Sequence, residues 1–153
     1  MTVENDILIP FQAQLLSEQK EVLFTPAGVS MRPFIEGGKD SVVLKSVTAE
    51  PQVGDIILAS VATQSGGKTY VLHRLIRIQS GEKGIIYILQ GDGNLVGEET
   101  CSREDIIGRV TAIQTPSGSR KCLTRGRIWY HLLPIRKWLL KIYRHTVLVW
   151  CYN

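Results

Sequence analysis

The chain has 153 residues, long enough for one folded domain but too short for two of ordinary size. An apolar fraction of 44% with 21% charged residues excludes a disordered or fibrous protein. The net charge of +4 is unevenly distributed: residues 1–119 carry 10 Lys and Arg against 14 Asp and Glu, whereas residues 120–153 carry the other 8 Lys and Arg and no acidic residue.

The first predicted element is a short amphipathic helix. Apolar residues between Ile7 and Val22 recur at roughly helical spacing, with polar residues between them, and residues 22–25 then predict a strand. The acidic N-terminal segment has neither the basic stretch nor the apolar run of a secretory signal, and no apolar run approaches the length of a membrane span. We therefore expect a cytoplasmic protein without a membrane anchor before residue 30.

Short strands separated by glycine-rich turns follow. The pattern predicts strands at residues 41–45, 56–61, 69–78, 85–90 and 107–113. The run 69–78 is too long for a flat strand, so a bend is expected within it. With the N-terminal helix, these strands predict a mainly β domain over residues 1–119, arranged as an antiparallel barrel or sandwich.

Residues 120–153 form a basic, aromatic-rich tail with a predicted amphipathic helix. Its apolar face combines five residues at helical spacing: Ile128, Leu132, Ile135, Leu139 and Ile142. Three environments remain open for this tail: packing on the β domain, an anionic membrane surface, and nucleic-acid phosphate. Nucleic acid is the least favoured, because no DNA-binding motif accompanies the charges.

Three residues carry the candidate chemistry. Ser30 lies in a turn between Gly28 and Pro33, which places its hydroxyl on a constrained backbone. A serine becomes a nucleophile when a base takes its proton, and His73, oriented by a carboxylate such as Asp92, would do so near neutral pH. Lys68 is the rival base, but on a regular strand its side chain faces away from that of His73.

No cofactor and no metal are expected. Cys101, Cys122 and Cys151 are an odd number of cysteines, at spacings typical of neither a zinc site nor a redox pair. The sequence therefore predicts three reduced thiols, as in a cytosolic protein.

Four segments resemble, in order and spacing, the successive motifs of the signal-peptidase superfamily of serine peptidases: 28–34 (GVSMRPF), 53–57 (VGDII), 72–76 (LHRLI) and 90–94 (QGDGN). The resemblance implies the antiparallel, barrel-like fold of signal peptidases and repressor peptidases. His73 stands where the archaeal and endoplasmic-reticulum enzymes have histidine. The resemblance also implies that Ser30 is the nucleophile, that His73 is the base, and that Asp92 orients the base. The Ser30 backbone N–H would serve the oxyanion and Met31 would line the substrate groove.

The implied activity is cleavage of a peptide or propeptide by acyl transfer, with small side chains flanking the cut. An inactive peptide-binding module of the same fold is one alternative. A self-cleaving, repressor-like peptidase is another, but only about 27 residues precede the serine motif and no cleavage linker is evident. Contact with the inner membrane surface would involve residues 120–153.

Overall fold

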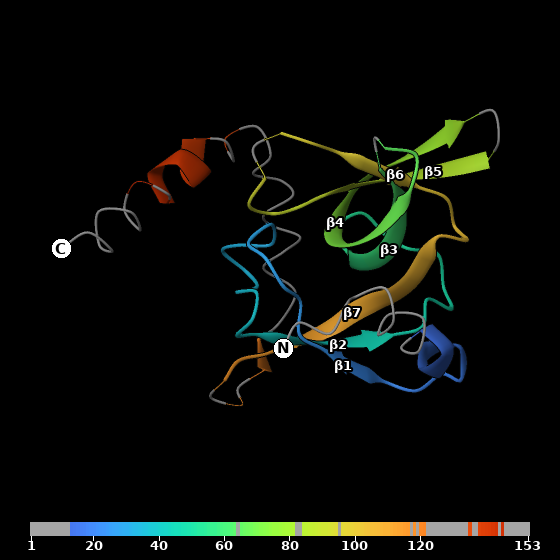
Figure 1. Ribbon diagram of the computed structural model, residues 1–153, viewed down its shortest axis with the longest axis horizontal. Helices are drawn as coiled ribbons and strands as arrows, with labels where there is room; N and C mark the ends of the chain where they lie inside the picture. The colour runs from blue at the N-terminus through green and yellow to red at the C-terminus, as the bar shows by residue number, and fades with distance from the viewer. Residues whose placement is uncertain are drawn as a thin grey trace.

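Antiparallel strands dominate the computed structural model (Figure 1). It describes residues 13–63, 65–81, 84–94, 96–116, 118, 120–121, 135, 138–143 and 145. The strands are β1 (Val22–Phe24), β2 (Ser41–Lys45), β3 (Ile56–Ala62), β4 (Lys68–Gly81), β5 (Gly84–Gln90), β6 (Glu99–Cys101), β7 (Ile106–Gln114) and β8 (Arg120–Lys121). Residues 13–17 and 138–143 are helical.

The strands form one sheet in the order β1-β2-β7-β3-β4-β5-β6, with β8 pairing with β7, and every pairing is antiparallel. The mainly β, antiparallel class is thus confirmed. Among the described strands, no pairing joins β1 to β6, so the sheet is open and the predicted barrel closure is not formed by them.

Strand β4 is the longest, at 14 residues, and it bends as its length requires. Its register against β5 shifts between Leu75 and Arg77, which marks a β-bulge there. Before this bulge β4 pairs with β3 from Lys68 to Arg74, whereas its pairing with β5 runs from Arg74 to Gly81. Among the described strands, the first half of β4 therefore has a neighbour on one side only.

The central strands bury both of their faces. Alternate residues of a strand point to opposite sides, so Leu58 of β3 joins one apolar cluster and Ile57 joins another. The first cluster also contains Leu16 of the N-terminal helical residues and Met31 and Ile35 of the serine turn. The serine turn is therefore fixed to the same core as the sheet.

The structure describes only part of the predicted tail. Arg120 and Lys121 belong to the sheet as β8, so the change from β domain to tail falls after them. Residues 122–134 and 146–153 lie outside the described residues, and so do residues 1–12. In the part of the chain that is described, no helix is long and apolar enough to cross a bilayer.

Truncating the core should cost much more stability than truncating an exposed edge residue. Leu58→Ala removes a fully buried side chain, and we expect it to lower the free energy of unfolding by about 2–5 kcal/mol. Leu23→Ala on β1 is the matched control, because Leu23 is exposed, and its effect should stay within about 0.5 kcal/mol. Urea unfolding followed by circular dichroism measures both changes; equal effects would contradict this assignment of the core.

Candidate active site

The serine turn is a compact series of backbone hydrogen bonds over residues 28–35. Gly28 has a φ of +84°, a left-handed conformation that glycine adopts readily. The amide of Arg32 donates to the Val29 carbonyl at 3.1 Å, and the amide of Ile35 donates to the Met31 carbonyl at 3.1 Å. Because Met31 and Ile35 are buried in the core while Val29 is exposed, the turn presents Ser30 between core and solvent.

A second loop holds the carbonyl of Ser30. The amide of Gly93 donates to the Ser30 oxygen at 2.7 Å. A Cβ added to Gly91 would lie 2.6 Å from that same oxygen, so a side chain at residue 91 would push the loop away. The two glycines that flank Asp92 thus allow this loop to pack directly under the nucleophile.

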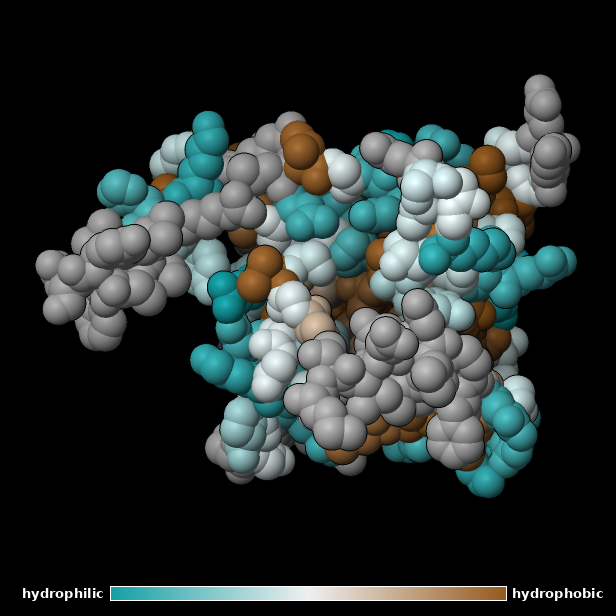
Figure 2. All heavy atoms as spheres, viewed as in Figure 1, coloured by the Kyte–Doolittle hydropathy of each residue, from teal (hydrophilic) through white to brown (hydrophobic). Residues whose placement is uncertain are grey.

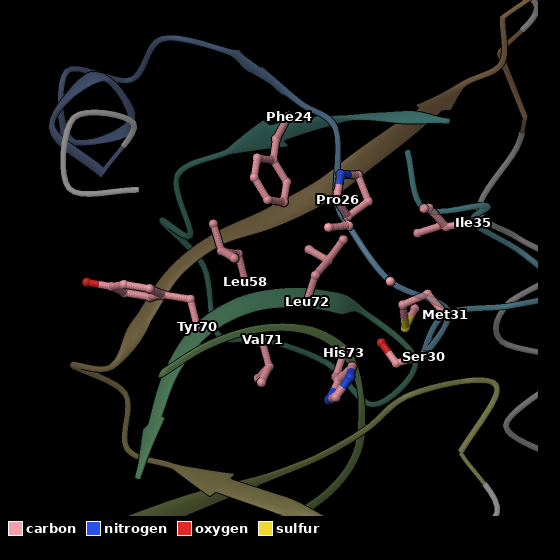
Figure 3. A pocket seen from close by; sticks show the side chains of 13 residues that line it. Phe24, Pro26, Ser30, Met31, Ile35, Leu58, Tyr70, Val71, Leu72 and His73 are labelled. Carbon is pink, nitrogen blue, oxygen red and sulfur yellow. The ribbon is translucent and has the colours of Figure 1, made fainter. Parts of the chain in front are cut away.

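Ser30 and His73 line one pocket of about 140 Å³. In Figure 3 the Ser30 hydroxyl and the His73 imidazole point toward one another at one end of it. Among the described contacts no hydrogen bond joins the two side chains, and catalytic contacts are often long before substrate binds. The remaining wall is mostly apolar and contains Phe24, Pro26, Ala27, Gly28, Met31, Ile35, Gly37, Leu58, Tyr70, Val71 and Leu72.

Glu99 on β6 is the carboxylate that bonds His73. Its Oε2 lies 2.9 Å from Nδ1 of the imidazole. A carboxylate only accepts hydrogen bonds, so Nδ1 carries the proton and donates it to Glu99. Nε2 is then the nitrogen that can accept a proton, as a general base requires. His73 is buried and Glu99 half-buried, so the pair is largely shielded from solvent.

Asp92 does not make the predicted contact with His73. Its two oxygens accept from Nε and Nη2 of Arg74 at 2.8 and 2.6 Å. The remaining nitrogen, Nη1, donates to the Gly54 carbonyl at 2.7 Å. The physical reason is strand alternation: His73 and Arg74 are consecutive on β4, so their side chains leave opposite faces and reach different carboxylates. This corrects the predicted pairing and adds Glu99 to the site.

The Arg74–Asp92 pair connects the parts of the site. Both side chains are buried, with exposed fractions of 2% and 0%. Arg74 lies next to His73 on β4, and its guanidinium carbon is 5.8 Å from the ring centroid of Phe34 in the serine turn. Asp92 lies in the loop that bonds the Ser30 carbonyl. The ion pair therefore connects the strand that carries His73 with the loop that bonds the serine turn.

Two other residues that the sequence singled out, Met31 and Lys68, lie at different distances from the pocket. Met31 is buried and lines the pocket, as the groove assignment requires. Lys68, the rival base, has a side chain 71% exposed and bonds Asp105 at 3.0 Å, outside the pocket lining. The role of the Ser30 N–H as an oxyanion donor stays a prediction.

Sequence reasoning missed Glu99 because residues 95–101 look like an irregular polar segment. The available signal was the alternation of polar Glu99, exposed Thr100 and apolar Cys101, which fits a short half-buried strand. That strand pairs with β5, placing Leu89 opposite Glu99, and β5 in turn pairs Leu89 with Leu75 of β4. Only this three-strand register brings Glu99 near His73.

Neither a scan of the chain against protein-family models nor a search of the curated proteins finds a match. Among the described residues, no group of three or more His, Cys, Asp or Glu side chains is placed to hold a metal ion. The functional argument therefore rests on the geometry of Ser30, His73 and their partners.

Replacing each of the two carboxylates should change the free energy of unfolding by different amounts. Asp92→Asn breaks a buried ion pair, and we expect it to lower the free energy of unfolding by about 3 kcal/mol or more. Glu99→Gln is the matched control: Glu99 is half-buried, so its loss should cost less than about 1 kcal/mol. Urea unfolding of both variants provides the comparison, and a larger loss for Glu99→Gln would reverse the assignment.

Proposed function

We propose that this protein is a serine endopeptidase of the signal-peptidase type, in which Ser30 is the nucleophile, His73 the general base and Glu99 the carboxylate that orients the base. The observation that carries the proposal is the arrangement of the first two residues on one pocket, with Glu99 bonded to the far side of the imidazole. A hydroxyl, an imidazole and an orienting carboxylate are the parts that acyl transfer at neutral pH requires.

The reaction follows from these positions. His73 Nε2 takes the Ser30 proton as the oxygen attacks the peptide carbonyl, and the imidazolium then gives that proton to the leaving amine. Water, activated by the same nitrogen, hydrolyses the acyl-enzyme and releases the acid. Glu99 keeps the proton on Nδ1 and stabilises the imidazolium while it exists. The Ser30 N–H is the proposed donor to the developing oxyanion.

The fold proposed here is the barrel-like fold of signal peptidases and repressor peptidases. The support is that all four sequence motifs meet. Arg74 from the 72–76 segment bonds Gly54 of the 53–57 segment and Asp92 of the 90–94 segment. The 90–94 segment bonds Ser30 in turn through Gly93. Four segments spread along the sequence therefore act as one structural unit, as a shared site demands.

The open half of β4 is the proposed binding edge for the substrate. Ser60 lies opposite Tyr70, and the Ser60 amide donates to the Asp105 carbonyl on the side away from β4. In an antiparallel pair of this kind both residues direct their backbone groups outward, so Tyr70, and by alternation Leu72, present N–H and C=O groups away from β3. No described strand pairs there before Arg74. An extended peptide can add at such an edge and pass Ser30.

The pocket suggests which side chain the substrate places beside the cut. Its walls between Phe24, Tyr70 and Leu72 are apolar, and its volume of about 140 Å³ is close to the ~150 Å³ of apolar cavities that hold benzene. A pocket of this size accommodates an aliphatic side chain up to about leucine, and it has no described charge partner for an acidic or basic one.

Removing the nucleophile or the base should abolish peptide cleavage. We expect Ser30→Ala and His73→Ala each to lower the cleavage rate by at least about 10³-fold, because the two residues act as a unit. Glu99→Gln should lower the cleavage rate by a smaller factor, because this variant keeps both the Ser30 hydroxyl and the His73 imidazole. Mass spectrometry of a mixed peptide library incubated with each protein measures the products, and a fluorophosphonate probe should label Ser30 in the wild-type chain but give no label in Ser30→Ala.

A peptide-binding module without turnover is the second candidate, favoured by the open edge of β4, which serves binding whether or not Ser30 reacts. It predicts library peptides retained on the protein, no products and no probe on Ser30. Cleavage that survives in Ser30→Ala would overturn both candidates.

Pocket size should set the cleavage preference. Tyr70→Ala removes part of the wall, and we expect the favoured side chain to shift toward larger residues by roughly tenfold in relative cleavage rate. Thr69→Ala is the matched control, because Thr69 precedes Tyr70 on β4 and its side chain leaves the opposite face. The relative cleavage rates of both variants are measured on the same peptide library. An unchanged preference in Tyr70→Ala would show that the substrate side chain does not enter this pocket.

A further inference from the structure

The helical residues 138–143 have apolar side chains on two sides. Leu140 is 2% exposed, so one side is packed against protein. Trp138 and Ile142 are 65% and 43% exposed, and their spacing of four residues puts them on a common face. Ile135, one turn earlier and also exposed, continues that face. Ile135 and Ile142, which were predicted to share the apolar face of the helix, are both exposed, and Leu140, which was not placed on that face, is the buried residue.

The charge of the tail indicates which kind of surface the exposed face of this helix would bind. Lys141 is exposed beside Trp138 and Ile142, and residues 120–153 contain 8 Lys and Arg but no Asp or Glu. A helix that exposes an aromatic and aliphatic side chains together with cations suits the headgroup level of an anionic bilayer, where apolar groups enter and cations meet lipid phosphate. Nucleic-acid phosphate would satisfy the cations but would leave the isoleucines exposed to water.

The helix lies beside the serine turn. Arg32 in that turn bonds Glu36, and its pKa is raised chiefly by this hydrogen bond and in smaller part by nearby Tyr143. Val29, next to Ser30, is exposed. Figure 1 shows the helical segment near the end of the molecule opposite the hairpin of β4 and β5. The helical segment and the serine turn therefore lie toward the same end of the protein, away from the hairpin of β4 and β5.

We propose that Trp138, Ile142 and Lys141 form an interfacial surface that binds anionic lipid membranes. The surface makes the protein a peripheral membrane protein, and no helix among the described residues is long and apolar enough to span the bilayer. If the proposed peptidase activity holds, on which this consequence rests, bound protein acts on peptide segments that lie at or emerge from the membrane surface.

The test uses the full chain with lipid vesicles and does not depend on cleavage. Flotation should recover the protein with vesicles of mixed phosphatidylglycerol and phosphatidylcholine, but at least about tenfold less with phosphatidylcholine alone. The Trp138→Ser/Ile142→Ser double variant should lose about tenfold or more in partitioning, because two exposed apolar side chains are removed. Lys141→Gln should bind anionic vesicles about fivefold more weakly than the wild-type chain. High salt screens the charges and should not restore the binding of this variant.

Ile85→Ser is the matched control, because Ile85 is a comparably exposed isoleucine on β5, in the hairpin at the other end of Figure 1, and it should bind as the wild-type chain does. Ser30→Ala should also bind normally, so that failure of peptidase activity and failure of membrane binding are read separately. Equal binding to both vesicle types, or no loss in the double variant, would overturn the proposal. So would preferential binding to DNA, or a concentration-dependent dimer that the double variant abolishes.

Discussion

The buried ion pair between Arg74 and Asp92 is the contact on which the rest of the site depends. Moving two charges out of water is unfavourable unless hydrogen bonds compensate, and here Arg74 donates to both oxygens of Asp92 and to the Gly54 carbonyl. Each partner sits in a segment that also does something else: Arg74 follows the base His73, and Asp92 lies in the loop that bonds Ser30. Separating the charges would therefore displace Ser30 and His73 together.

Two carboxylates near the base have different tasks, and their environments explain why. Asp92 is fully buried and needs a permanent cation, which Arg74 supplies. Glu99 is half-buried and pairs with an imidazole that can be neutral or charged. A carboxylate engaged by a guanidinium through both oxygens has little left to offer a histidine, whereas Glu99 can respond to a proton arriving on His73. The site thus separates a structural ion pair, Arg74–Asp92, from the pair that we propose to be catalytic, His73–Glu99. Figure 2 shows that hydrophilic residues cover much of the rim of the visible face and that hydrophobic residues lie between them.

Local patterns predicted much of the fold and part of the site. Alternation and glycine turns located the strands, including the bend in β4, because these signals depend on neighbouring residues. Ser30 and His73 were predicted from turn chemistry, strand position and the order of the four motifs; the structure puts both on one pocket, and their catalytic roles stay predictions. The pairing of His73 with Glu99 was not found, since it depends on the register of three strands. The order of strands in the open sheet, with β7 between β2 and β3, is equally a long-range property.

The length of β4 links sheet building to substrate binding. A strand paired on both sides throughout would leave no edge for a peptide, and a shorter strand would end before it reached Arg74. Strand β4, with 14 residues, pairs with β3 from Lys68 to Arg74 and with β5 from Arg74 to Gly81, so that among the described strands only one side of Lys68–His73 is paired. His73, the proposed base, lies next to Arg74, where the two pairings meet and where the ion pair with Asp92 forms. On the proposed function, a peptide added along the open half would be brought to His73, directly beside the buried ion pair.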